Sequence, residues 1–372
     1  MMASNVSGIV FANSHDELID KLTEHRSTAS VPFGGRYRLI DFTLSNLVNS
    51  GVTNIGIITR EKYRALMDHV GSGLFWDLDR KNGGLRILPP YNTSNVRRYI
   101  GYVEAIKGAM DFVTRCNTEY IILCDAATVA NIDISDVMAF HTANNADITV
   151  VYHNGIMPCG NEETMSIVTD KNNRITNIEF DCFFDDKINY GLGVTVFKRT
   201  KLVELIEEAY LNGYTSINRD IIVRKLTALN VYGYSHEGIA FVINSNKTYF
   251  DANMKLLESD VRNDLFSKDR PVYTKTRDDM PTRYGTKSSV QNCFIADGCV
   301  VDGTVKNSIL FRGVKVEKGA VVENSILMQG VTVCKNANIN YLISDKNAVI
   351  GSDVTVKGTE QKAFFIRKNQ TL

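Results

Sequence analysis

The motif Asn307-Ser-Ile-Leu-Phe-Arg-Gly313 returns almost unchanged as Asn324-Ser-Ile-Leu-Met-Gln-Gly330. Looser copies stand on either side, as Asn292-Cys-Phe-Ile-Ala-Asp-Gly298 and Asn340-Tyr-Leu-Ile-Ser-Asp-Lys346, so the four asparagines lie fifteen, seventeen and sixteen residues apart. A unit of this length is too short for a helical-hairpin repeat or a propeller blade, but it matches one coil of a parallel β-helix. A small antiparallel sandwich would explain the alternation of apolar residues but not the recurring motif. We therefore predict a parallel β-helix over residues 289–372.

The residues before about position 258 follow a different pattern, in which short apolar runs alternate with helical stripes. This alternation is typical of α/β domains with a mostly parallel sheet. The runs that predict buried strands are Ile9–Phe11, Ile55–Ile58, Tyr120–Leu123 and Ile148–Val151. Doubly wound sheets bind ligands at the carboxyl ends of their strands, so the loops after Phe11, Thr59 and Leu123 are the candidate site.

A polar segment with Pro271 and Pro281 separates the two patterns. Prolines at this spacing interrupt regular elements, so the segment is typical of a crossing linker. The predicted organisation is an α/β domain over residues 1–258, a linker over 259–288 and the β-helix over 289–372.

The overall charge excludes some classes of partner. Forty-two basic residues balance forty-two acidic ones, so no global field attracts nucleic acid or a membrane surface. The seven cysteines are scattered and never spaced as C-x-x-C, which favours free thiols in a reducing compartment over a zinc site. No run of about eighteen apolar residues occurs. We expect a cytoplasmic protein.

Three longer stretches resemble a known family: Val31-Pro-Phe-Gly-Gly-Arg-Tyr-Arg-Leu-Ile-Asp-Phe42, Leu44-Ser-Asn46 with Asn49-Ser-Gly51, and Tyr249-Phe-Asp-Ala-Asn-Met-Lys-Leu-Leu257. They are similar to ADP-glucose pyrophosphorylase, which is glucose-1-phosphate adenylyltransferase. The resemblance covers nearly the whole chain, and it implies a Rossmann-like nucleotidyltransferase domain followed by a left-handed β-helix. Within the family, the segments at 11–17, 59–63 and 67–73 resemble the GlgD-type regulatory subunit more than the catalytic one.

The family's triphosphate loop is altered in this chain. In catalytic members the loop reads G-G-x-G-x-R-L, and a lysine follows downstream; its glycines let backbone N–H groups surround the phosphates. Counting back from Pro32, that loop falls on residues 13–19, where the arginine is replaced by Leu18 and the later lysine by Thr28. Asp16 and Glu17 would repel a polyphosphate.

Of the two aspartates that the family uses to hold Mg²⁺, only the first is retained, as Asp125. The second falls on Val242, which cannot bind magnesium. We therefore expect no cofactor in this chain and Mg²⁺ only in a catalytic partner, and we assign no catalytic residue with confidence. An alternative role for Asp125 is to cap the turn after its strand.

Recognition of the sugar phosphate is weakened as well. The family's F-x-E-K-P stretch falls on Ile178-Glu-Phe-Asp181, which lacks the lysine. Gly191 stands where the family has a serine, and Tyr102 would crowd the pocket.

Basic residues concentrate in segments that the family places near its effector site, between the two domains. Arginine forks bind sugar phosphates with two hydrogen bonds. The sequence therefore predicts an effector or phosphate site formed by Arg36, Arg38, Arg60, Arg64 and Arg98, with Lys62 and Arg97 nearby. The alternative is an ordinary solvated face.

The resemblance implies a regulatory, non-catalytic or weakly catalytic subunit of ADP-glucose pyrophosphorylase. It would assemble with a catalytic homologue, as a heterotetramer, and modulate glycogen biosynthesis in response to a phosphorylated sugar. Two alternatives are a competent adenylyltransferase with a rearranged loop and a free-standing sugar-phosphate sensor. An acyltransferase role for the β-helix is disfavoured, because the last histidine, His236, precedes it.

Overall fold

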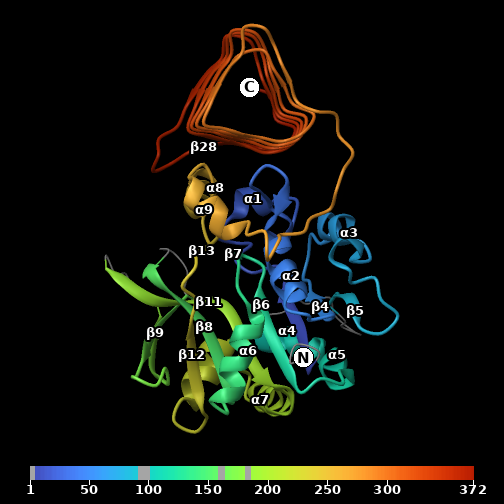
Figure 1. The fold of residues 1–372 in the computed structure, drawn as a ribbon, viewed down its shortest axis with the longest axis vertical. Helices are drawn as coiled ribbons and strands as arrows, with labels where there is room; N and C mark the ends of the chain where they lie inside the picture. Colours follow the sequence, from blue (N-terminus) through green and yellow to red (C-terminus); the bar gives the residue numbers. More distant parts are fainter. Residues whose placement is uncertain (1–4, 91–100, 158–163, 181–185) are drawn as a thin grey trace.

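The computed structural model describes residues 5–90, 101–157, 164–180 and 186–372. Figure 1 shows an α/β domain and, stacked on one end of it, a prism of triangular cross-section that contains the C-terminus. Within the described residues, no helix is long and apolar enough to cross a membrane.

A nine-stranded sheet forms the centre of the α/β domain. Its main path runs β10-β9-β11-β6-β1-β4-β5, while β8 pairs with β11 and β12 pairs with β8. The strands are β1 (Val6–Phe11), β4 (Asn54–Ile58), β5 (Gly84–Leu88), β6 (Tyr120–Asp125), β8 (Ile148–Ile156), β9 (Met165–Thr169), β10 (Ile175–Phe180), β11 (Lys187–Lys198) and β12 (Val231–Ser235). All four predicted strands form. β1 pairs in parallel with β4 and β6, whereas β11 pairs antiparallel with β6, β8 and β9.

Helices cover this sheet and connect it to the prism. They are α1 (Asp20–Thr23), α2 (Leu39–Asn49), α3 (Arg64–Val70), α4 (Tyr102–Gly108), α5 (Met110–Arg115), α6 (Ile134–Ala143), α7 (Arg199–Leu211), α8 (Asn246–Lys255) and α9 (Ser259–Leu265). Shorter turns are η2 (Thr28–Ser30), η3 (Leu74–Trp76) and the π-helix η4 (Ile217–Val223). Two small pairs complete the domain: β2 (Pro32–Phe33) with β3 (Tyr37–Arg38), and β7 (Thr128–Ala130) with β13 (Ala240–Val242).

The prism is the predicted β-helix, built from three five-stranded parallel sheets. The first holds β14 (Arg283–Tyr284), β17 (Val300–Val301), β20 (Lys315–Val316), β23 (Thr332–Val333) and β26 (Val349–Ile350). The second holds β15 (Ser289–Gln291), β18 (Thr304–Lys306), β21 (Val321–Glu323), β24 (Asn338–Asn340) and β27 (Thr355–Lys357). The third holds β16 (Phe294–Ile295), β19 (Ile309–Leu310), β22 (Ile326–Leu327), β25 (Leu342–Ser344) and β28 (Phe364–Ile366).

The repeated asparagines stand at corners of the prism with a left-handed backbone. Asn292, Asn307 and Asn324 have φ between 46° and 51°, a region that asparagine tolerates better than most residues. The fourth copy of the repeat, aligned on Asn340 in the sequence, is one residue out of register, because Asn340 ends β24 and Tyr341 (φ 51°) turns the corner. Strand pairing agrees, since Ile326 lies opposite Ile343.

The two domains share one apolar cluster. Phe33, Phe250 and Leu256 of the α/β domain pack in the same cluster as Ile309 and Phe311 of the β-helix. The turn between β2 and β3 reaches this contact through two glycines with positive φ, Gly34 and Gly35. A Cβ at Gly35 would lie 3.7 Å from the Leu310 carbonyl oxygen, so the turn rests directly on the β-helix.

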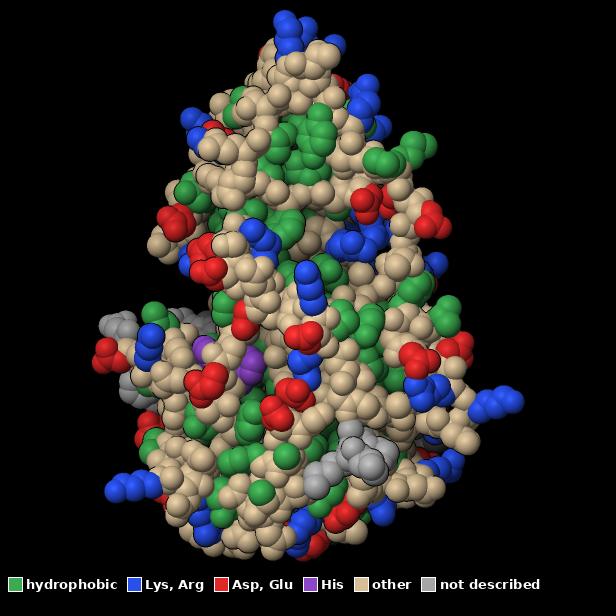
Figure 2. Space-filling view, in the orientation of Figure 1, with side chains coloured by type: hydrophobic (Ala, Val, Ile, Leu, Met, Phe, Trp, Pro, Cys, Tyr) green, Lys and Arg blue, Asp and Glu red, His purple; other side chains and the backbone are tan. Residues whose placement is uncertain are grey.

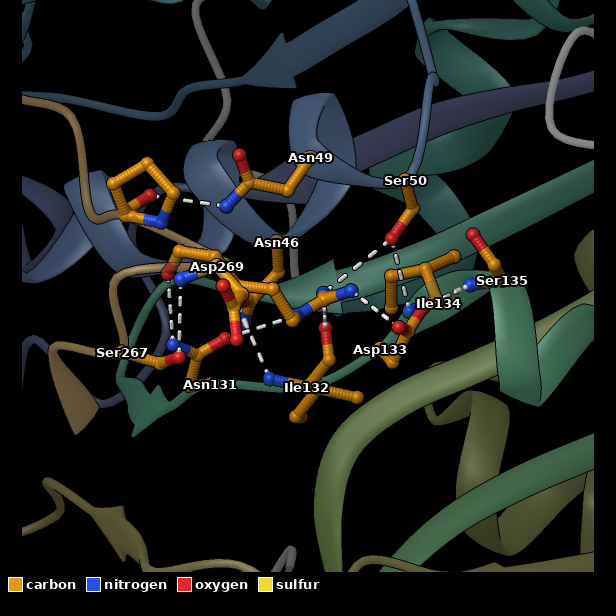
Figure 3. Close-up of polar contacts among 12 residues, drawn as sticks. Asn46, Asn49, Ser50, Asn131, Ile132, Asp133, Ile134, Ser135, Ser267 and Asp269 are labelled. Atoms are coloured by element: carbon orange, nitrogen blue, oxygen red, sulfur yellow. Dashed lines mark hydrogen bonds and ion pairs between the residues drawn. The ribbon is translucent and has the colours of Figure 1, made fainter. Parts of the chain in front are cut away.

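The chain crosses from one domain to the other through a segment that begins and ends in regular structure. Helix α9 occupies the start of the predicted linker, 259–288, and β14 lies near its end. Between them, the Arg270 guanidinium forms an ion pair with Asp133 and donates to the carbonyl of Ile132. Figure 3 shows the neighbouring contacts of Asn49, Ser50 and Asn131. These bonds fix the segment to the α/β domain.

Substitution of Gly303 by alanine should destabilise the β-helix. A Cβ there would meet the carbonyl oxygen of Ala320 and lie 2.8 Å from that of Glu317, so the backbone must shift. We expect a loss of about 1–3 kcal/mol in unfolding free energy, measured by urea denaturation. Gly313→Asn is the control, because that corner has φ +70° and open space. An equal loss in both variants would contradict this account.

Candidate functional site

A cleft opens at the carboxyl ends of β1 and β6, where the strand order predicts a ligand site. Its walls include His15, Tyr102, Asp125, Gly191 and Val242. Within the described residues, no lysine or arginine lines it. Two of the predicted basic residues, Arg97 and Arg98, lie outside the described residues.

Asp125 ends β6 at the base of this cleft and has two partners. One carboxylate oxygen lies 3.3 Å from His15 Nε2, and the other accepts the N–H of Ala127 at 3.0 Å. Gly193 (φ +67°) packs so closely that a Cβ there would lie 2.6 Å from the Asp125 Cβ. The carboxylate therefore caps its turn and faces a histidine, where a magnesium site would need a second acid.

The position expected to hold the second acid is occupied by a valine, and the structure buries this side chain. Val242, in β13, is buried against β7 and lines the same cleft as Asp125. Among the described residues, no group of three or more histidine, cysteine or acidic side chains could hold a metal ion. The residues present do not fit the Mg²⁺ pair of a catalytic member.

The loop that replaces the triphosphate loop is closed by its own side chains. One oxygen of Asp16 accepts the N–H of Thr28 at 2.8 Å and its hydroxyl at 2.6 Å, and the other accepts the Asn13 amide at 2.7 Å. The N–H groups of Leu18 and Ile19 donate to the carbonyl of His15. Donors that a phosphate would need are thus already occupied.

Burial disfavours the charged form of the Asp16 carboxyl that closes this loop. Burial raises the pKa of its carboxyl above the usual value, although the hydrogen bonds from Thr28 and Asn13 oppose the shift. Lys62 also acts on it electrostatically and opposes the shift, while its ammonium donates to the Thr23 carbonyl at 3.0 Å. The loop therefore presents a carboxylate where the family's enzymes present cations.

The positions expected to recognise the sugar are also changed. Tyr102 packs edge-to-face on Phe11, with ring centroids 4.5 Å apart, and so occupies part of the cleft. Glu179 is exposed and accepts the amide of Asn177 at 2.9 Å. Asp181, the last position of the aligned stretch, lies outside the described residues.

The predicted basic residues fall in two places. Arg36 and Arg38 belong to the turn that rests on the β-helix, and the Arg38 guanidinium donates to the Ala65 carbonyl at 2.6 Å. Burial lowers the pKa of Arg38 to about 10. Arg60 instead lies two residues after β4, where its backbone N–H donates to the side chain of Asn13, and Arg64 begins α3. The prediction of one site from all five arginines remains a prediction.

Sequence reasoning missed a buried ion pair that crosses between the domains. Arg26 donates to both oxygens of Asp345 at 2.8 Å, although 319 residues separate them. Asp345 takes the position in its coil that Met328 takes in the coil before, as the pairing of Leu327 with Ser344 shows. The signal in the sequence was an acidic residue, Asp345, at a repeat position that Met328 fills with an apolar side chain. The fourth repeat was aligned on Asn340, one residue too early, so the two positions did not line up.

In comparison with known proteins, each of the two domains matches a family model. Residues 19–179 match the nucleotidyl transferase family model, and residues 279–368 match the GlmU-like C-terminal hexapeptide model. The fold is therefore a nucleotidyltransferase domain followed by a left-handed parallel β-helix.

Full-length relatives are also known. The chain is 36% identical to the glycogen biosynthesis protein GlgD of Geobacillus stearothermophilus, over 99% of this chain and 97% of the relative. It is 33% identical to GlgD of Bacillus subtilis (strain 168) over the same shares. A glucose-1-phosphate adenylyltransferase of Geobacillus stearothermophilus is 30% identical over 86% of this chain and 84% of the relative.

Replacement of Asp16 by asparagine should change how stability depends on pH. Because the pKa of Asp16 is raised in the folded state, that state takes up the proton at a higher pH than the unfolded chain. The wild type should therefore gain stability relative to Asp16→Asn as the pH falls from 7 towards 4. Urea denaturation at several pH values measures the difference. Asp20→Asn, at an exposed position, is the charge-matched control. A difference that is flat or reversed would refute the assignment.

Proposed function

The chain belongs to the GlgD family of glycogen biosynthesis proteins, and from this premise we propose that it is a regulatory subunit of ADP-glucose pyrophosphorylase. On its own it has little or no activity in forming ADP-glucose and pyrophosphate from ATP and glucose 1-phosphate. The observation that carries the proposal is the cleft, where Asp125 faces His15 and Val242 replaces the second acid.

The electrostatics of the cleft support this proposal. Transfer of a nucleotidyl group to a sugar phosphate brings two polyanions together, so an enzyme must supply cations or metal ions at the reacting phosphates. Here Asp16 lies in the loop that should hold the triphosphate, and its three donors come from Asn13 and Thr28. Loss of one such stabilising group commonly costs about a hundredfold in rate. Such losses do not simply add, but together they leave little catalysis.

We infer that the functional partner is a catalytic homologue, with which this chain forms a hetero-oligomer such as a heterotetramer. One organism, Geobacillus stearothermophilus, has both a GlgD protein and a glucose-1-phosphate adenylyltransferase that are similar to this chain. In such an assembly the Mg²⁺ and both substrates would bind the catalytic subunit. This chain would act through contacts between subunits, where coupling is typically about 1–3 kcal/mol.

The proposed effector is a phosphorylated sugar bound at the seam between the domains. Figure 2 shows basic and acidic side chains gathered at the waist between the β-helix and the α/β domain. Arg36 and Arg38 lie on the turn that contacts the β-helix, and Arg277 lies close enough to Arg38 to influence its charge. Arginines of this kind can grip a phosphate with paired hydrogen bonds.

The purified chain should make little or no ADP-glucose alone, but should alter the kinetics of a catalytic homologue when the two are mixed. The readouts are kcat, KM and effector response of the partner, with bovine serum albumin in place of this chain as the control. Magnesium-dependent activity of the chain alone at a rate comparable to that of the catalytic homologue would instead establish a competent enzyme with a rearranged loop. If the two proteins formed no complex, the remaining interpretation would be a free-standing sugar-phosphate sensor.

Arg38→Gln should reduce the effector response of the mixed enzyme about tenfold or more, because it removes a charged phosphate donor. Glutamine keeps a donor for the Ala65 carbonyl, so the turn itself should survive. The measurement is the effector concentration for half-maximal response, with Arg80→Gln, in a separate exposed ion pair with Asp77, as the control. An unchanged response would place the effector site elsewhere.

A further inference from the structure

The sequence contains three Asn-Gly pairs, Asn82-Gly83, Asn154-Gly155 and Asn212-Gly213. In such a pair the backbone nitrogen of the glycine can attack the side-chain amide of the asparagine before it. Glycine favours this attack, because it has no Cβ to hinder the approach and adopts many backbone conformations. A folded chain permits the reaction only where the two groups can move together. The three pairs therefore share one chemistry but differ in how the fold restrains them.

Hydrogen bonds at the end of α7 hold the pair Asn212-Gly213. The Asn212 amide donates to the carbonyl of Glu208 at 2.8 Å, and the Gly213 N–H donates to that of Tyr210 at 3.1 Å. Both reacting groups are thus bound to the helix. The reaction must wait until the end of the helix opens locally.

The pair Asn154-Gly155 is held by the sheet. Both residues belong to β8, where Asn154 lies opposite Asn189 and Gly155 lies opposite Ile188 of β11. The Asn154 amide also donates to the Asn189 side chain at 2.8 Å. Side chains of a strand stand roughly perpendicular to the sheet, whereas backbone N–H groups lie in its plane. The two reacting groups therefore point apart.

The pair Asn82-Gly83 has neither kind of restraint. It lies in the bend between η3 and β5, where Asn82 is exposed. Among the hydrogen bonds of the described residues, none involves the Asn82 side chain or the Gly83 N–H. The first restraint comes one residue later, where the Gly84 N–H donates to the Thr53 carbonyl at 2.7 Å. The reacting groups of this pair can therefore meet without local unfolding.

We propose that Asn82 is a site of spontaneous deamidation, which proceeds in the folded chain while Asn154 and Asn212 are protected. The Gly83 nitrogen gives its proton to a solvent base and bonds to the side-chain carbonyl carbon of Asn82, and the amide nitrogen takes up a proton and leaves as ammonia. Water then opens the succinimide ring at either carbonyl, which yields aspartate or isoaspartate at position 82. No atom is oxidised or reduced. The modification is independent of the regulatory role proposed above.

The isoaspartate product should loosen the start of β5. Its backbone runs through the former side chain and is longer by an additional carbon atom. The turn has little room for this atom, since a Cβ at Gly84 would lie 2.6 Å from the Leu78 carbonyl oxygen, and one at Gly83 would lie 3.0 Å from that of Thr53. The bond from Gly84 to Thr53 stands where the pairing of β5 with β4 begins, so it is the contact that must give way.

Peptide mapping by mass spectrometry of the purified full chain, aged at mildly alkaline pH, measures the reaction at each pair. Position 82 should deamidate at least about fivefold faster than positions 154 and 212, because those pairs must first break their hydrogen bonds. In urea the three rates should converge, since only the fold distinguishes the pairs. Equal rates in the folded chain, or a difference that persisted undiminished in urea, would overturn the inference.

Two variants separate the new charge from the lengthened backbone. Asn82→Gln should stop the reaction at this position, because glutamine must close a larger ring, and the exposed position should tolerate the change. Asn82→Asp carries the charge on a normal backbone and, freshly purified, should unfold at the same urea concentration as the unaged wild type. Aged wild type should unfold at a lower concentration. Its isoaspartate is counted from the methyl groups that an isoaspartyl methyltransferase adds, with aged Asn82→Gln as the background. Equal midpoints for aged wild type and Asn82→Asp would refute the effect on β5.

Discussion

The apolar contact between the two domains is the constraint on which the rest of this molecule depends. Phe33, Phe250 and Leu256 share one cluster with Ile309 and Phe311, so neither domain has a complete surface of its own at this seam. Burial of apolar area contributes about 25 cal/mol per Å² and has no preferred direction. The polar contacts at the edge of the cluster, above all Arg26 with Asp345, therefore set how the domains are oriented.

Residues of the motifs that identify the family form hydrogen bonds that hold the fold together. Asn46 donates to the carbonyl of Ala130 at 2.9 Å, and Asn49 donates to that of Pro271 at 3.0 Å. Tyr249 donates its hydroxyl to the carbonyl of Pro32, and Asn253 accepts the N–H of Gly34. None of these bonds involves a residue that lines the cleft, so the scaffold can keep its signature whatever chemistry the cleft performs.

Local and periodic features could be predicted from the sequence, whereas contacts between distant segments could not. The repeats predicted the β-helix, because each coil stacks on a copy of itself, and apolar runs predicted β1, β4, β6 and β8. Nothing in the local pattern joins Arg26 to Asp345, because the pair depends on how two domains dock. The corner at Tyr341 was missed because asparagine adopts the left-handed backbone conformation more readily than tyrosine, so the repeat was aligned on Asn340.

The cleft and the seam between the domains differ in the charged groups that they contain. Among the described residues, no lysine or arginine lines the cleft; Asp16 accepts the Thr28 hydroxyl within its loop, and Asp125 faces His15. At the seam, Arg26 forms a buried ion pair with Asp345, and Asp41 and Asp68 act electrostatically on Arg38. Within the part of the chain that the structure describes, the cleft offers a phosphorylated ligand no cation, which is why the proposed effector site is the seam, where Arg36 and Arg38 lie beside the β-helix.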